Sequence, residues 1–218
     1  MTVRGSAESV EARLRAGRLR GPCCGGVLAP WGWARPRVVA MSGGLAEFCP
    51  RRGRCRRCGR THVLLPAVLW SRRRYGAAVI MAVLMLRVQA LKAARAAARP
   101  WLPAPGGGRR LVPASTAWSW WSRFAGRAGV LRQQLMGVLP LADPVARVLP
   151  AAGSPAGDCL AALEAVTAGL RRRFPELLAA VTAHEVAAHL SGGLWLAPAA
   201  PVLRFNTTLF AVDAVSPS

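Results

Sequence analysis

Two cysteines in the first third of the chain have the spacing of a metal-binding turn. Cys55 and Cys58 are separated by two residues, and Gly59 follows them. The tight turn of such a sequence brings both thiolates to one side, and the glycine tolerates the positive φ that lets backbone N–H groups point at sulfur. The pattern is half of a zinc knuckle, and zinc is therefore the cofactor that we expect.

The other half of the knuckle should lie upstream, where the pattern is incomplete. Cys24-Gly25 supplies the second cysteine and the glycine, but Gly21 stands where the first cysteine belongs. The candidates for the missing fourth ligand are Cys23, Cys49 and His62. The predicted metal ligands are Cys24, Cys55 and Cys58, with Cys23 included although vicinal cysteines chelate poorly. The alternative is a set of incidental thiols on a metal-free hairpin.

Arginines surround the downstream cysteine pair. They are Arg51, Arg52, Arg54, Arg56 and Arg57. A run of charge is usually a solvated loop, but a rigid knuckle would present it as an edge that contacts phosphate. We therefore predict that these five side chains bind nucleic acid.

The charge of the whole chain supports a polyanionic partner. The net charge is +21, and residues 1–74 contribute +13, residues 75–138 contribute +9 and residues 139–218 contribute −1. A GC-rich coding sequence would inflate arginine, but it explains neither the scarcity of acids nor the position of the charge. Such a field binds polyanions by counterion release. Double-stranded DNA is the first candidate, and an anionic membrane surface, with Ala77–Leu86 as the apolar face, is the second.

Composition and periodicity divide the chain into five parts. They are a basic N-terminal arm (1–20), a zinc-ribbon-like domain (21–66), a helical segment resembling a helix-turn-helix (71–139), a Pro/Gly-rich linker (140–158), and C-terminal helices with an irregular tail (159–218). The expected fold class is α+β, mostly α, with the small β ribbon preceding the helices.

The expected elements follow from local signals. Short strands are expected at Val27–Leu28, Trp31–Trp33, Arg37–Ala40 and Thr61–Leu65. Helices are expected at Tyr75–Arg99, at Thr116–Phe124 with a continuation to Leu139, and at Cys159–Leu190 with a break near Pro175. Ser115 is the expected N-cap of the second helix.

The two helices between residues 75 and 124 suggest a helix-turn-helix. In that motif the N-terminal residues of the second helix enter the major groove. Ser115, Thr116 and Arg123 would then lie in or near the groove, while the aromatic residues at 118, 120, 121 and 124 pack in the core. The connection from Arg99 to Pro113 is longer than the three or four residues of the usual turn.

The order of these motifs resembles an uncharacterised, transposase-associated actinobacterial family with an N-terminal zinc ribbon and a helix-turn-helix. The matching stretches are Pro22–Pro36, Pro50–Pro66, Arg72–Tyr75, Pro113–Phe124 and Ser191–Pro198. The resemblance implies DNA binding linked to insertion elements and no established activity. Gly21 and the long connection depart from the family pattern, which leaves a degenerate, non-functional remnant as a further alternative.

Catalysis is not expected. His184 and His189 flank a glutamate, but histidines five residues apart lie about 140° around a helix from each other, unlike those of zinc proteases. A transposase core needs three convergent carboxylates, and the acids here are few and scattered. No Gly-rich phosphate loop or nucleophile elbow is present.

The first 20 residues lack an apolar signal region, which together with six cysteines predicts a cytoplasmic protein with free or metal-bound thiols.

Overall fold

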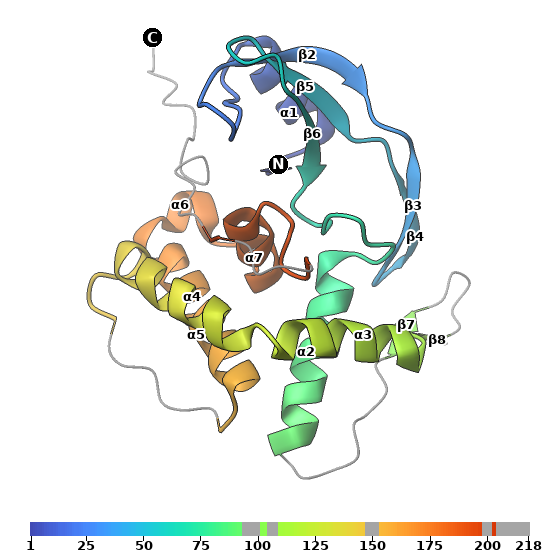
Figure 1. Cartoon of the computed structure of the whole chain (residues 1–218), viewed down its shortest axis with the longest axis vertical. Coiled ribbons are helices and arrows are strands. Elements are labelled where there is room, and N and C mark those ends of the chain that lie inside the picture. The colour runs from blue at the N-terminus through green and yellow to red at the C-terminus, as the bar shows by residue number, and fades with distance from the viewer. Residues whose placement is uncertain (93–100, 104–108, 147–152, 198–201, 204–218) are drawn as a thin grey trace.

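Strands and one helix from the first third of the chain form a sheet half, and helices from the remainder form a helical half (Figure 1). The structure is a computed structural model that describes residues 1–92, 101–103, 109–146, 153–197 and 202–203. The expected α+β class, with a small N-terminal sheet region followed by helices, is confirmed.

The sheet half contains one four-stranded sheet and one hairpin. Its elements are β1 (Thr2–Val3), α1 (Ala7–Arg15), β2 (Leu28–Trp33), β3 (Arg37–Met41), β4 (Gly44–Phe48), β5 (Arg51–Cys55) and β6 (Thr61–Pro66). The sheet has the order β1-β6-β5-β2, in which β1 is parallel to β6 and the other pairs are antiparallel. Strands β3 and β4 form a separate two-stranded sheet, and Ala40 of β3 also bridges to Tyr75. The long β2–β5–β6 ribbon therefore leads from the cysteine turns toward the helices.

Helix α1 covers one face of this ribbon. It starts after Ser6, whose hydroxyl accepts a hydrogen bond from the Ser9 N–H at 3.2 Å. Leu14 of α1 is buried against the strands, and a Cβ on Gly53 would lie only 3.2 Å from its Cδ1 atom. The missing side chain at Gly53 therefore lets the helix approach the sheet.

Residues 1–20, expected to be a basic arm, are instead part of the sheet half. Val3, Val10, Leu14 and Leu19 are buried in one cluster with Leu28, Cys55 and Leu64 of the strands. The N-terminal ammonium also donates a hydrogen bond to the Val63 carbonyl at 2.8 Å. Val10 and Leu14 lie on the side of α1 that faces this cluster, so the basic segment forms an amphipathic helix that packs on the strands.

Strands β2, β3 and β6 lie close to the expected positions, but β4 and β5 were not expected. The sequence of β5, Arg-Arg-Gly-Arg-Cys, has little intrinsic strand preference. It is a strand because it is the central member of the ribbon, paired with β2 on one side and β6 on the other. Tertiary pairing here overrides local propensity.

The helical half contains the remaining elements. They are α2 (Ala77–Lys92), β7 (Trp101–Pro103), β8 (Arg109–Leu111), α3 (Ala114–Ala125), α4 (Ala128–Ala142), α5 (Pro155–Arg173), α6 (Pro175–Leu178) and α7 (Ala183–Ser191). The break near Pro175 is found as expected. Residues 93–100 of the expected first helix lie outside the described residues.

Helix α2 lies in the core. Ala77, Ile80 and Leu84 are completely buried, and Val79, Met81 and Val83 are buried with them. Most of the segment 77–86 is therefore buried in the core, although Ala82 is exposed and Met85 and Leu86 are half-buried. In the part of the chain that is described, no helix combines the length and apolarity needed to cross a bilayer.

Three expectations about the later helices need correction. Helix α3 starts at Ala114 with Pro113 in the N-cap position, so Ser115 is not the cap. The expected continuation to Leu139 is a separate helix, α4, because the chain turns at Gly126-Arg127. Residues 140–142 and 155–158, expected in the linker, are helical, and Pro140 is accommodated in the last turn of α4.

Helices α4 and α5 pack closely at Gly169. A Cβ at this position would lie 2.7 Å from the Asp143 Cβ and 3.1 Å from the Ala142 carbonyl carbon. We expect Gly169→Ala to lower the free energy of unfolding by about 1–3 kcal/mol, because backbone at the contact must move. Urea denaturation measures the change.

Gly137→Ala is the matched control, because Gly137 is also helical but its Cβ would meet no atom within 4 Å. Alanine there is expected to raise the free energy of unfolding by up to about 1 kcal/mol, as helix propensity predicts. If both substitutions stabilise the protein equally, the close contact at Gly169 is refuted.

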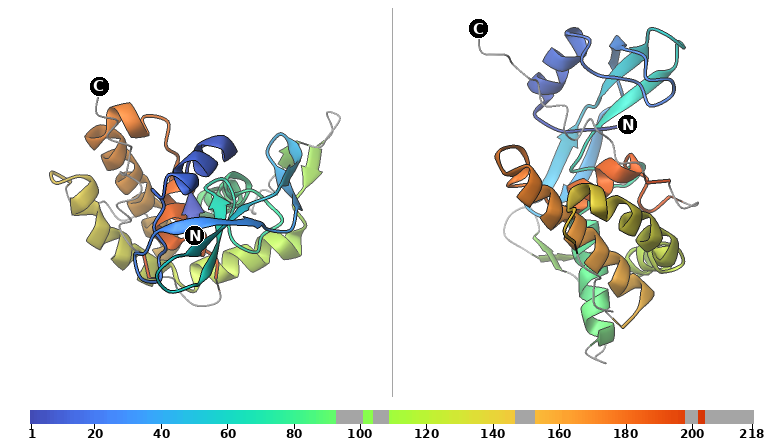
Figure 2. Two further views of the ribbon diagram at one scale, coloured as in Figure 1. Left: turned by 90° about the horizontal axis from the view of Figure 1, so that it is seen from above. Right: turned by 90° about the vertical axis from the view of Figure 1, so that its left-hand side faces the viewer.

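The two halves are joined through α7 and the segment after it (Figure 2). The Thr2 hydroxyl donates to the Ala188 carbonyl at 3.1 Å, and the Ser71 N–H donates to the Gly193 carbonyl at 2.7 Å. Trp70 is buried, and its indole N–H donates to the His184 carbonyl at 3.4 Å. These bonds connect β1 and the loop after β6 to α7 and the segment that follows it.

Candidate metal centre

Two turns bring four cysteine thiols together. Cys23 and Cys24 precede β2, Cys55 ends β5, and Cys58 lies in the turn before β6. The four sulfur atoms all lie within 4.8 Å of one another. Cys23 Sγ is 3.0 Å from Cys58 Sγ, and Cys24 Sγ is 3.5 Å from Cys55 Sγ. Sulfurs in a tetrahedral zinc–thiolate site are about 3.8 Å apart, so this donor set can hold a metal ion.

The two turns have the same backbone geometry. Gly25 has φ of 68° and Gly59 has φ of 69°. The Gly25 N–H donates to the Gly21 carbonyl and the Gly59 N–H to the Cys55 carbonyl, both at 2.9 Å. Gly21 is therefore the structural counterpart of Cys55, as the spacing suggested, and Cys23 brings the missing thiol to the cluster from a different position in the turn.

Gly26 allows the two turns to meet. A Cβ at Gly26 would lie 2.8 Å from the Cys55 sulfur and 2.8 Å from the Arg57 Cβ. Any other residue would push the two turns apart. This glycine was not singled out from the sequence, because its role depends on a contact between segments 29 residues apart.

The thiols differ in acidity. Backbone N–H groups, first that of Cys58 and then that of Arg57, stabilise the thiolate and lower the pKa of Cys55 to about 6. Cys23 lies against the Cys58 sulfur, and this contact raises the pKa of Cys23 to about 12. A cation bound by all four sulfurs would displace the remaining protons.

The other candidate ligands lie outside the four-thiol set. His62 Nε2 is 3.4 Å from the Cys23 sulfur, and burial lowers the pKa of this imidazole. Cys49 is exposed and its thiol contacts the Ala34 carbonyl at 3.4 Å, away from the other cysteines. Cys159 is buried in α5, where burial raises its pKa to about 12.

Most of the predicted arginine edge is exposed. Arg52, Arg54, Arg56 and Arg57 are exposed, as is Arg60. Two of them also stabilise the turns: the Arg54 guanidinium donates to the Gly59 carbonyl at 3.2 Å, and that of Arg57 donates to the Cys24 carbonyl at 3.4 Å.

Arg51 is different from its neighbours. Its side chain is 14% exposed, and its Nε lies 2.5 Å from a carboxylate oxygen of Glu11 on α1. It also donates to the Gly32 carbonyl at 2.6 Å. The Arg51 guanidinium lowers the pKa of Glu11. Arg51 therefore fixes α1 on the sheet, and its charge is not available to a phosphate.

Two tryptophans on β2 lie beside the arginines of β5. Trp31 and Trp33 are 52% and 55% exposed. The Arg54 guanidinium lies 4.5 Å from the Trp31 ring centroid, and that of Arg51 lies 4.8 Å from the Trp33 centroid. The sequence predicted these tryptophans in a strand but did not predict their exposure; the register of β2 against β5 shifts between Pro30 and Gly32.

The helix-turn-helix expectation is only partly reflected in the geometry. Ser115 and Arg123 are exposed on α3 and Thr116 is half-buried. However, the connection between α2 and α3 contains the β7–β8 hairpin and is not a short turn. Trp120 and Phe124 are core residues as expected, whereas Trp118 is 59% exposed and lies against Arg87.

The C-terminal histidines form no common site. His189 is 5% exposed, and burial lowers its pKa to about 4, so the imidazole is neutral. His184 lies beside the Thr182 hydroxyl, and Glu185 accepts a hydrogen bond from the Thr182 N–H at 2.9 Å as part of the α7 cap. Across the residues that the structure describes, the four-cysteine cluster is the one metal-capable group of three or more such side chains.

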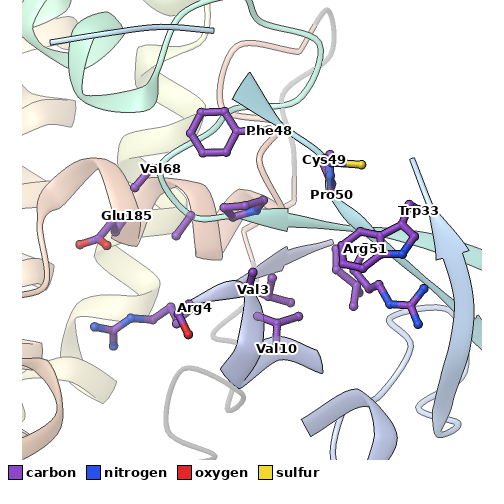
Figure 3. A pocket seen from close by; sticks show the side chains of 16 residues that line it. Val3, Arg4, Val10, Trp33, Phe48, Cys49, Pro50, Arg51, Val68 and Glu185 are labelled. Carbon is purple, nitrogen blue, oxygen red and sulfur yellow. The ribbon is translucent and has the colours of Figure 1, made fainter. Parts of the chain in front are cut away.

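A hollow of about 330 Å³ separates the sheet half from α7 (Figure 3). Val3, Val10 and Phe48 give it apolar walls, and Glu185 stands at its far side. The Glu185 carboxylate is already bound to Thr182 in the helix cap. The Arg4 side chain and the Cys49 thiol also line the hollow.

Comparison with known proteins concerns the part of the chain that carries the cysteines. No curated protein and no solved structure is similar to this chain. Residues 21–101 match the model of a family described as a domain of unknown function (DUF6431), so the expected similarity to an uncharacterised family is confirmed for this segment.

Proposed function

We propose that this protein binds double-stranded DNA through the arginine surface of its sheet half, which a zinc ion on Cys23, Cys24, Cys55 and Cys58 holds in shape. The observation that carries the proposal is a set of exposed guanidinium groups next to the thiol cluster. Arg52, Arg56 and Arg60 are exposed, and their guanidinium groups make no hydrogen bond to any described residue. They are available to an external anion.

The charge near this surface is not neutralised within the sheet half. The acids of residues 1–74 are Glu8, Glu11 and Glu47, against 16 arginines. Glu11 is already paired with Arg51 and Arg15. A phosphate polymer neutralises such an excess and releases its counterions in doing so, which favours association.

A metal ion on the thiol cluster would hold the arginine surface in one conformation. A metal ion would join the turn before β2 to the turn after β5, and Arg54 and Arg57 bond to carbonyls within these turns. Guanidinium groups on a rigid turn lose less conformational entropy on binding than those on a free loop. Phosphate contacts of this kind position a protein on DNA without reading its sequence.

Two further parts of the proposal rest on other grounds. Ser115, Thr116 and Arg123 on α3 are proposed as groove contacts because they lie at accessible positions of one helix. A non-catalytic role as an accessory or regulator of a mobile element rests on the family resemblance, and within the described residues no three carboxylates converge as nucleotidyl transfer requires.

The salt dependence of DNA binding tests this proposal. Fluorescence anisotropy with a labelled duplex is expected to give a slope of log K against log salt of magnitude about 5 or more. Each of Arg52→Gln, Arg56→Gln and Arg60→Gln is expected to reduce that magnitude by about 1, because each removes one phosphate contact.

Arg172→Gln is the control, because Arg172 carries the same charge but lies on α5 and pairs with Asp143. It should leave the slope unchanged. A salt-independent affinity, or equal effects of all four substitutions, would refute the sheet surface as the binding site. Binding to anionic vesicles is measured in parallel. Equal binding to vesicles and to DNA would show that the protein responds to any anionic surface.

A further inference from the structure

A second basic site is built by different elements, on the helical half. The loop between β6 and α2, helix α3 and the segment after α7 enclose a hollow of about 430 Å³. Arg72, Arg73 and Arg123 form its charged wall, and Leu194, which is exposed, contributes apolar surface, while Trp70 is buried beneath it. Three guanidinium groups thus line one concave site.

The charges of this hollow repel one another. Burial lowers the pKa of Arg73, and the positive charges of Arg123 and Arg127 lower it further. None of the carboxylates in the described ranges forms an ion pair with Arg72, Arg73 or Arg123. Like charges gathered without a counterion are unfavourable, and an anion bound between them would relieve the repulsion.

The arginines are held in place by the backbone. Arg73 donates a hydrogen bond to the Leu196 carbonyl, which fixes it against the segment after α7. The Ser71 N–H bonds to the Gly193 carbonyl at 2.7 Å and closes the floor of the hollow. Arg72 has φ of 58°, a left-handed conformation that costs an L-residue energy and is found where a structure needs a special chain direction. The Arg73 side chain and the floor of the hollow are therefore fixed without a ligand.

We infer that this hollow binds a phosphate group between Arg72, Arg73 and Arg123. Guanidinium forks match phosphate oxygens through paired, charge-assisted hydrogen bonds. The volume exceeds that of one phosphate, and the exposed Leu194 side chain offers apolar contact to the group that carries it. The phosphate comes either from a nucleic-acid backbone or from a free phosphate compound. The inference goes beyond the proposed function: it shares Arg123 with the proposed groove contacts, but it needs neither the metal nor the sheet surface.

Thermal unfolding with pyrophosphate tests the site on the full chain. Pyrophosphate is expected to raise the melting temperature of the wild type, since a ligand that binds only the folded state stabilises it. Sodium chloride at equal ionic strength gives the reference. Arg123→Gln and Arg72→Gly are each expected to weaken pyrophosphate binding about tenfold or more, measured by calorimetry. Glycine tolerates the φ of residue 72, so Arg72→Gly removes the guanidinium without disturbing the turn.

Arg74→Gln is the matched control, because Arg74 is exposed in the same loop but does not line the hollow. It should respond to pyrophosphate as the wild type does, and so should Arg52→Gln, which tests the sheet surface only. A short DNA duplex that displaces pyrophosphate identifies a backbone phosphate, and one that does not identifies a free phosphate compound. The inference is overturned if Arg72→Gly and Arg123→Gln behave like Arg74→Gln, or if no pyrophosphate binds.

Discussion

Replacing both Cys55 and Cys58 by serine is expected to abolish metal binding and to unfold the sheet half. The buried cluster of this half is small, and Cys55, 1% exposed, is one of its members. A structural zinc ion contributes roughly 10–16 kcal/mol of binding free energy in zinc-finger peptides, and such domains are unfolded without it. A serine at position 55 would also bury a hydroxyl in place of a thiolate.

Two measurements detect the loss of metal and of sheet structure in the Cys55→Ser/Cys58→Ser variant. Elemental analysis of protein purified without chelator is expected to find one zinc per wild-type chain and none in the double variant. Hydrogen exchange is expected to become fast in β5 and β6 while α4 and α5 stay protected. Cys49→Ser is the control, because that exposed thiol lies outside the cluster. A metal-free wild type with a protected sheet would contradict the zinc proposal.

Trp195→Ala is expected to lower the free energy of unfolding by about 3–5 kcal/mol. Trp195 is fully buried, and its ring centroid lies 6.4 Å from that of Trp70 and 6.5 Å from that of Phe124. These rings come from the loop before α2, from α3 and from the segment after α7. Removing the indole would leave a cavity where three segments meet.

Urea denaturation measures the loss for Trp195→Ala. Trp118→Ala is the control that separates the packing of Trp195 in the core from a general effect of losing a tryptophan. Trp118 is 59% exposed and contacts Arg87, so its replacement is expected to cost less than about 1 kcal/mol. Similar losses for the two variants would show that the segment after α7 is not part of the cooperative core.

The sequence was informative about chemistry and less so about geometry. The C-x-x-C-G pattern predicted the metal-binding turn, and the gap at Gly21 was visible as a departure from symmetry. Cys23 was included among the predicted ligands, but the sequence offered no physical reason to prefer it to Cys49 or His62, because that choice depends on how two turns approach each other at Gly26. Contacts between distant segments leave no local signal.

The same limit applies to the elements. Alternating or periodic apolar residues predicted β3, β6 and α5, whereas β5 is charged and carries no such pattern. Arg51 was grouped with its neighbours because nothing in the local sequence indicates that Glu11, 40 residues away, pairs with it. The hollow at Arg72, Arg73 and Arg123 likewise joins residues 50 positions apart.

The equivalence of Gly21 and Cys55 affects how proteins of this kind can be found. A search that demands two complete cysteine pairs would pass over this chain, because its upstream turn reads Cys-Cys-Gly. A query that keeps the two positive-φ glycines and lets one thiol move by two places would retrieve it. Backbone conformation, more than cysteine spacing, defines this class of turn.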